Sequence, residues 1–169
     1  MTKKAEQAGK KILDQRRLEL RNQIWGNEVE NLTIWDPSRY KGFAYIPRHL
    51  PQVSRIMDKL AGTGKPVSGV YLSLLCNVFS HGFIEVKDKK RLAFESGFSG
   101  PRALTTWHSR MKKLEELGFI QTKSGTHDEF SYVLVIDPLN VIKNIYESKG
   151  KDALYNSLVS RMNEIGTVL

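Results

Sequence analysis

The chain has 169 residues, with 40% hydrophobic and 26% charged residues, a formal net charge of +8 and an isoelectric point near 9.6. These values are ordinary for one soluble globular domain with extensions, and no apolar run reaches the roughly 18 to 20 residues of a membrane span. No apolar segment follows the N-terminal lysines, so a secretory signal is not predicted. The single cysteine, Cys76, cannot form an internal disulfide, and we therefore expect a cytoplasmic protein.

The excess positive charge lies in two segments. Residues 1–22 contain seven basic and three acidic side chains, and residues 88–113 contain seven basic and two acidic ones. Their net charges are +4 and +5, while the remainder of the chain is close to neutral. This concentration of positive charge favours a polyanionic partner.

The first part of the chain contains a basic segment and one amphipathic helix. Residues 1 to about 23 have only a thin apolar stripe, which predicts a basic helix or a disordered arm that is mobile unless bound. Aromatic residues on both sides of Ala44 indicate a short strand or extended segment. From Pro51 to the stop at Gly62 a helix is predicted, because apolar residues recur at i, i+3, i+4 and i+7: Val53, Ile56, Met57 and Leu60.

The Gly64-Lys65 pair does not form a phosphate-binding loop. That motif requires a glycine at the position of Lys59 and a serine or threonine at the position of Pro66. We interpret these residues as a helix stop followed by a helix that begins near Pro66.

The helix predicted over residues 66–81 is expected to be the central buried helix, because apolar residues cover more than half of its circumference. Cys76 lies in this helix and is expected to be a packed thiol rather than a nucleophile. His81 is expected at the end of the helix. The apolar residues are Val70, Tyr71, Leu74, Leu75, Val78 and Phe79.

A strand, a capped helix and a tight turn are predicted next. Residues 83–86 form the strand, and Asp88 can cap the helix that follows it. Gly97 can adopt the left-handed conformation that a tight turn between two helices needs. The helix before this turn contains Leu92, Ala93 and Phe94.

A longer helix and two β-rich runs follow the turn. The helix extends from about residue 100 to Leu117 and stops at Gly118. The β-rich runs, residues 119–123 and 130–136, predict a hairpin.

Two amphipathic helices complete the chain, and the first opens at Pro138. Their apolar residues form a dimer interface or pack on the preceding domain, and the sequence leaves both alternatives open. The residues concerned are Leu139, Ile142, Leu154, Leu158 and Met162.

Three local features, taken in this order, resemble the winged helix-turn-helix family over residues 66–137. They are LAFESGFS, with Ala93 and Gly97 four residues apart, LEELGFI (residues 114–120), and the hairpin FIQTKSGTHDEFSYVLVID. The resemblance implies a mainly α fold with a small β-hairpin wing. The chain would then begin with a basic N-terminal arm at residues 1–31. The winged helix-turn-helix domain, with one preceding helix, would span residues 32–137, and the C-terminal helices would follow at residues 138–169.

The helix before the hairpin has one apolar and one polar face. Counted at 100° per residue, the face around Trp107 holds Ala103, Leu104, Met111 and Leu114. The opposite face carries basic and hydroxyl side chains, with almost no acids until Glu115 and Glu116. It consists of Arg102, Thr105, Ser109 and Lys112, flanked by Thr106 and Lys113.

The resemblance implies that this polar face lies in a major groove. Arg102 and Thr105 would then lie near base edges, and Ser109, Lys112 and Lys113 near phosphates. Two alternatives remain: the face is only solvated, or it binds another protein.

Further contacts with DNA are expected at two other places. A helix N-terminus favours anions, so Lys89, Lys90 and Arg91 are candidates for phosphate contacts. At the tip of the hairpin, Asp128 and Glu129 count against a deep contact. The tip candidates are Lys123, Ser124, Thr126 and His127.

Catalysis is not expected. The four histidines are scattered without a second ligand at metal spacing, and no local Ser-His-Asp or Cys-His pattern is present. No cofactor, metal or effector ligand is predicted.

The sequence therefore predicts a cytoplasmic protein that binds double-stranded DNA specifically, most simply a bacterial-type transcriptional regulator that acts as a homodimer. One alternative is a plasmid partition or replication factor with a protein partner. Another is a winged-helix interaction module without affinity for DNA.

Overall fold

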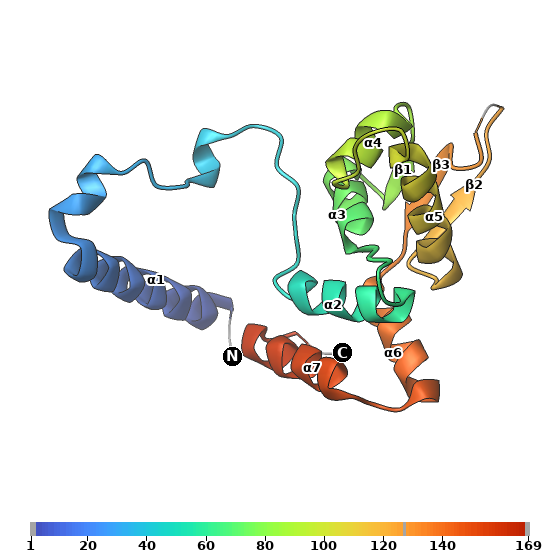
Figure 1. The fold of residues 1–169 in the computed structure, drawn as a ribbon. Coiled ribbons are helices and arrows are strands. Elements are labelled where there is room, and N and C mark those ends of the chain that lie inside the picture. Colours follow the sequence, from blue (N-terminus) through green and yellow to red (C-terminus); the bar gives the residue numbers. More distant parts are fainter. Residues whose placement is uncertain (1–2, 127, 168–169) are drawn as a thin grey trace. The chain divides into compact units, whose positions relative to one another are not determined.

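The computed structural model describes residues 3–126 and 128–167, which belong to two compact units, residues 1–43 and 44–169 (Figure 1). The chain is mainly helical, with one small antiparallel sheet of three strands in its described part. None of the described helices is both long enough and apolar enough to cross a bilayer.

The first unit consists of α1 (Lys3–Trp25) and two 3-10 helices, η1 (Gly26–Asn31) and η2 (Pro37–Arg39). Of the two alternatives for the basic segment, the structure shows the helix. Large apolar side chains of this unit are exposed, among them Ile24 at 63% and Trp35 at 70%. Of the two alternatives around Ala44, the strand does not form in the described structure.

In the second unit, α2 (Leu50–Ala61) begins one residue before the predicted helix. Its predicted apolar face is confirmed, because Val53, Ile56 and Met57 are fully buried. Gly62 ends the helix with a φ of 97°, a conformation that glycine adopts without strain. The remaining helices of this unit are α3 (Ser68–Asn77), α4 (Lys89–Glu95), α5 (Ala103–Glu116), α6 (Pro138–Lys149) and α7 (Ala153–Ile165).

The central helix α3 is shorter than predicted. A carboxylate from α2 fixes its start, because Asp58 accepts hydrogen bonds from the N–H groups of Val67 and Ser68 at 2.7 and 2.9 Å. Beyond Asn77 the chain turns into extended backbone, which leaves Phe79 97% exposed instead of buried.

Two further expectations for this segment were wrong. Cys76 is exposed on α3 and is not a packed thiol. His81 does not end the helix; it lies in the following turn with a φ of 57°.

The sheet consists of β1 (Phe83–Glu85), β2 (Ile120–Lys123) and β3 (Tyr132–Val135), with β3 in the middle. The predicted hairpin is confirmed as the antiparallel pair β2–β3, and β1 joins the other edge of β3. One face of the sheet belongs to the core, where Ile84, Ile120 and Val133 are buried. The other face is exposed.

The C-terminal helices are part of the same core. Ile142 and Leu158 have no exposed surface and Met162 is 1% exposed, while Leu139 and Leu154 pack against this core. Of the two alternatives for these side chains, the structure shows the packing on the domain.

Helix α7 packs on α2, and Asp152 fixes this contact (Figure 1). Its carboxylate caps α7 by accepting from the N–H groups of Leu154 and Tyr155, both at 3.0 Å. It also pairs with the Lys59 ammonium at 2.8 Å and accepts from the Tyr146 hydroxyl at 3.1 Å. The hydrogen bond from Lys59 is the main cause that lowers the pKa of Asp152 from 3.8 to about 2.

Candidate nucleic-acid interface

Helix α5 is held by its apolar face, as the helical period predicted. Trp107 is 1% exposed, and Met111 and Leu114 have no exposed surface. The indole of Trp107 meets the ring of Phe130, from the hairpin, edge-on at 6.0 Å and 89°. Because this face is fixed in the core, the opposite face of α5 must point to solvent.

The exposed face of α5 contains the predicted residues. Arg102, Thr105, Ser109 and Lys112 are exposed, while Thr106 and Lys113 at the flanks are half-buried. Arg102 occupies the N-cap position without using its side chain as a cap.

The C-terminal half of this face is not free of carboxylates, which corrects the expectation from the sequence. Glu129, from the segment between β2 and β3, lies 3.1 Å from the His108 imidazole and 3.6 Å from the Lys112 ammonium. Lys113 pairs with Glu116 at 3.0 Å. Glu129 is 17 residues from Lys112 in sequence, and only the folding of the hairpin brings it to α5.

The N-terminal half of α5 keeps its positive and neutral character. No hydrogen bond or ion pair of the Arg102, Thr105 or Ser109 side chain occurs within the described residues. An arginine and two hydroxyl groups therefore remain available on consecutive turns of one helix.

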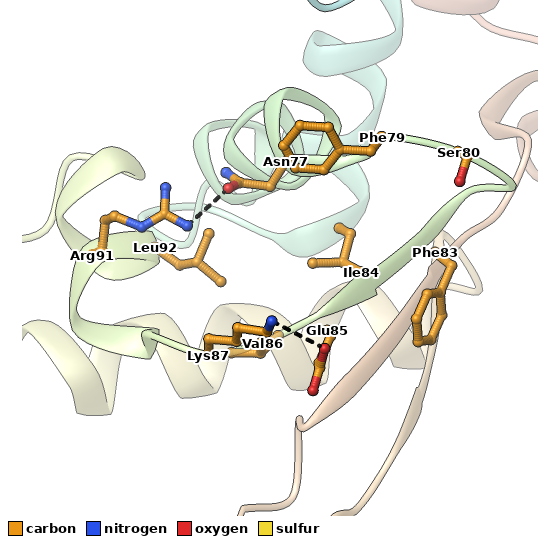
Figure 2. A pocket seen from close by; sticks show the side chains of 10 residues that line it. All are labelled: Asn77, Phe79, Ser80, Phe83, Ile84, Glu85, Val86, Lys87, Arg91 and Leu92. Atoms are coloured by element: carbon orange, nitrogen blue, oxygen red, sulfur yellow. Dashed lines mark hydrogen bonds and ion pairs between the residues drawn. The ribbon is translucent and has the colours of Figure 1, made fainter. Parts of the chain in front are cut away.

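The three basic residues at the start of α4 have different surroundings. Asp88 caps this helix as predicted, accepting from the Arg91 N–H at 2.9 Å. The Arg91 guanidinium pairs with Glu95 at 2.7 Å and donates to the Asn77 side chain at 3.0 Å, as Figure 2 shows for the second contact. Lys89 pairs with Asp128 of the hairpin. Only Lys90 has no ion pair within the described residues.

The Lys89–Asp128 pair connects α4 to the hairpin. The Lys89 ammonium, together with the N–H of Phe130, holds the pKa of Asp128 below its usual range. Both side chains are partly accessible, so the pair contributes more to the position of the hairpin than to stability. Lys89 is therefore engaged in a contact within the fold that the sequence did not indicate.

The turn between α4 and α5 has the predicted geometry. Gly97 has a φ of 88°, and the N–H of Phe98 donates to the carbonyl of Ala93 at 3.0 Å. Ala93 is 1% exposed and belongs to the hydrophobic core.

The predicted residues at the hairpin tip do not all point toward α5. Lys123 and Ser124 are exposed, but Lys123 lies on the outer face of the sheet, beside Tyr132 of β3. Thr126 is exposed, and His127 lies outside the described residues.

An open groove of about 430 Å³ follows the exposed side of α5. Besides the predicted residues, Lys65 and Arg110 line it, and the Arg110 guanidinium donates to the carbonyl of Gly64 at 3.3 Å. The sequence did not connect Lys65 with α5, since only the fold brings the two segments together; Arg110 and Gly64 are 46 residues apart. The groove is lined by Ala61, Lys65, Thr105, His108, Ser109, Arg110, Lys112, Lys113 and Glu116.

No group of His, Cys, Asp and Glu side chains in residues 3–126 and 128–167 is arranged to hold a metal ion. Neither protein-family models, curated proteins nor solved structures give a match to this chain.

Proposed function

We propose that residues 66–137 form a winged helix-turn-helix domain and that the chain binds double-stranded DNA through α5, most simply as a transcriptional regulator. The order α3, β1, α4, α5, β2 and β3, with a glycine turn between α4 and α5, supports this proposal. The hairpin β2–β3 would be the wing.

The observation that carries the proposal is the exposed N-terminal half of α5. The buried Trp107 fixes the rotation of the helix, so Arg102, Thr105 and Ser109 are presented together. An arginine can bind the O6 and N7 atoms of guanine through two hydrogen bonds, and a threonine can contact a base edge through its hydroxyl or methyl group. Arg102 and Thr105 therefore read bases, and Ser109 contacts a phosphate.

Basic residues around this face would contact the phosphate backbone. Lys112 and Lys113 lie on the groove side of α5, beside Lys65 and Arg110. The carboxylates that pair with Lys112 and Lys113 are exposed, and such pairs are worth about 0 to 1 kcal/mol. Exchanging them for phosphates therefore costs little.

The salt dependence of binding follows from the number of phosphate contacts. The four basic contacts, Lys65, Arg110, Lys112 and Lys113, predict a slope of log K against log salt of about −3.6, which is a loss of about 150-fold in affinity between about 50 and 200 mM salt. A solvated face without a role in DNA binding would show neither the affinity nor this slope.

A selection from a pool of random duplex DNA, run at both salt concentrations, tests the proposal. We expect one motif to be enriched and to persist at the higher salt. Enrichment of repeated sites would favour a plasmid partition or replication factor instead of a regulator. Absence of binding at both concentrations would contradict the proposal and favour the interaction module.

A further inference from the structure

The outer face of the sheet is an exposed apolar surface that the proposed DNA contact does not use. Phe83, Tyr132 and Leu134 are 45%, 41% and 42% exposed. The rings of Phe83 and Tyr132 stack on each other with centroids 6.2 Å apart at 15°. Figure 2 shows Phe83 and Glu85 on one side of β1 and Ile84 on the other, toward Leu92. An apolar sheet face of this kind usually marks a contact surface.

Charged residues of opposite sign flank this face. The register places Glu85 of β1 and Lys123 of β2 on either side of Tyr132, in one row across the three strands. Adjacent strands lie about 4.8 Å apart, so the acid and the base are separated by roughly 10 Å across the sheet. Glu85 lies 3.5 Å from Lys87, whereas Lys123 makes no ion pair within the described residues.

We propose that a second copy of this chain covers the outer face of the sheet, related by a two-fold axis parallel to β3. This axis brings Tyr132 and Leu134 of the central strand against the same residues of the partner. It also places Glu85 opposite the partner's Lys123, and Lys123 opposite the partner's Glu85. The face is thus complementary to itself in charge and in apolar character, as an isologous interface must be.

A single-stranded nucleic acid is a less favourable occupant of this face. Bases would stack on the two aromatic rings, but these rings already stack on each other. Glu85 and Lys123 both lie in the same row as Tyr132, so this row has no net positive charge to attract a phosphate backbone. The self-complementary charges therefore favour the second copy.

The proposed axis has a consequence for DNA binding. Rotation about a line parallel to the strands keeps both β2–β3 hairpin tips at the same end of the dimer. Two copies could then contact two half-sites on one side of a duplex. This consequence rests on the proposed function, whereas the dimer itself does not.

The side chains on the face are few, so the interface is smaller than the roughly 800 Å² per partner of a standard complex. We expect a dissociation constant on the order of 10 µM, and sedimentation equilibrium of the full chain from about 1 to about 500 µM covers this range. The average mass should rise from 19.3 kDa toward twice that value.

Charge reversal tests the geometry of the contact. Glu85→Lys and Lys123→Glu, each alone, would oppose like charges at both contacts, and each should weaken the dimer by at least tenfold. Mixed in equal amounts, the two variants should form a heterodimer of wild-type affinity, because both contacts again join an acid and a base. The melting temperatures should stay near that of the wild type, since both side chains are exposed.

Four results would overturn the proposal. A wild-type chain that is monomeric throughout the range excludes the dimer. Single variants that both dimerise with wild-type affinity place the interface elsewhere, and a mixture that dimerises no more tightly than either variant alone excludes the two-fold axis along β3. If Tyr132→Ser instead abolishes binding of a single-stranded oligonucleotide by a monomeric chain, the face is a nucleic-acid surface. Arg102 lies on α5 and not on the outer face of the sheet. DNA binding by the Arg102→Ala variant therefore tests the proposed function independently of the dimer.

Discussion

Replacing Trp107 by alanine tests whether α5 is held in the orientation that exposes Arg102. The indole is 1% exposed and meets Phe130 edge-on, so nearly its whole surface is removed from water. A buried tryptophan removes about 200 Å² of surface from water, which corresponds to about 5 kcal/mol at 25 cal/mol per Å². Substitutions of buried tryptophan by alanine cost about 3 to 5 kcal/mol, in agreement with this figure.

For a unit of this size, such a loss lowers the melting temperature by about 10 to 20 °C. Thermal unfolding followed by circular dichroism measures the change. Trp107→Phe keeps a ring against Phe130 and should cost roughly half as much. Thr105→Ala, on the exposed face of the same helix, is the matched control and should stay within about 0.5 kcal/mol of the wild type. A Trp107→Ala variant that melts within about 3 °C of the wild type would refute the orientation of α5.

Three further predictions concern the interface and the fold. Arg102→Ala should weaken binding to a selected site by about 1 to 3 kcal/mol and binding to random duplex by much less, measured by fluorescence anisotropy; equal losses would make Arg102 a phosphate contact. Gly97→Ala should cost about 1 to 2 kcal/mol in urea unfolding, because Gly97 has a φ of 88° and no atom lies within 4 Å of an added Cβ, so that only the backbone is strained. Because the pKa of Asp152 is lowered from 3.8 to about 2 by its Lys59 contact, its stabilising effect is complete above pH 3.8 and is lost as the pH falls toward 2. The difference in melting temperature between wild type and Asp152→Asn should therefore shrink over this interval, and a constant difference would contradict the assignment.

The helices with one clear apolar face were predictable from the sequence. In α2 and α5 the buried residues recur with the helical period, and Gly62 and Gly118 follow these helices with the positive φ of a helix stop. The polar face of α5 could be predicted for the same reason, since fixing the side of Trp107 also fixes the opposite side.

The end of α3 could not be predicted in this way. Apolar residues continue through Val78 and Phe79, and no glycine or proline interrupts them before Gly82. Periodicity does not distinguish a further helical turn from an exposed segment that leads into a strand. The chain leaves the helix at Val78 in order to reach β1, which is a requirement of the sheet and not of the local sequence.

Contacts between segments distant in the sequence account for the remaining differences between the predicted candidate site and the site in the structure. Glu129 and Asp128 reach α5 and α4 only after the hairpin has formed. Lys65 becomes part of the α5 groove through the loop after α2. The sequence alone does not show that Glu85 and Lys123 lie on either side of Tyr132, because this arrangement depends on the strand register.

The most direct test of DNA binding through α5 is to place a carboxylate on its exposed face. Ser109→Glu and Ser157→Glu make the same change at exposed positions of α5 and α7, so both variants have the same net charge. The dissociation constant for duplex DNA should be measured for both at one salt concentration. The proposal predicts a loss of at least about tenfold for Ser109→Glu and a change within about twofold for Ser157→Glu. Equal affinities of the two variants would contradict binding through α5.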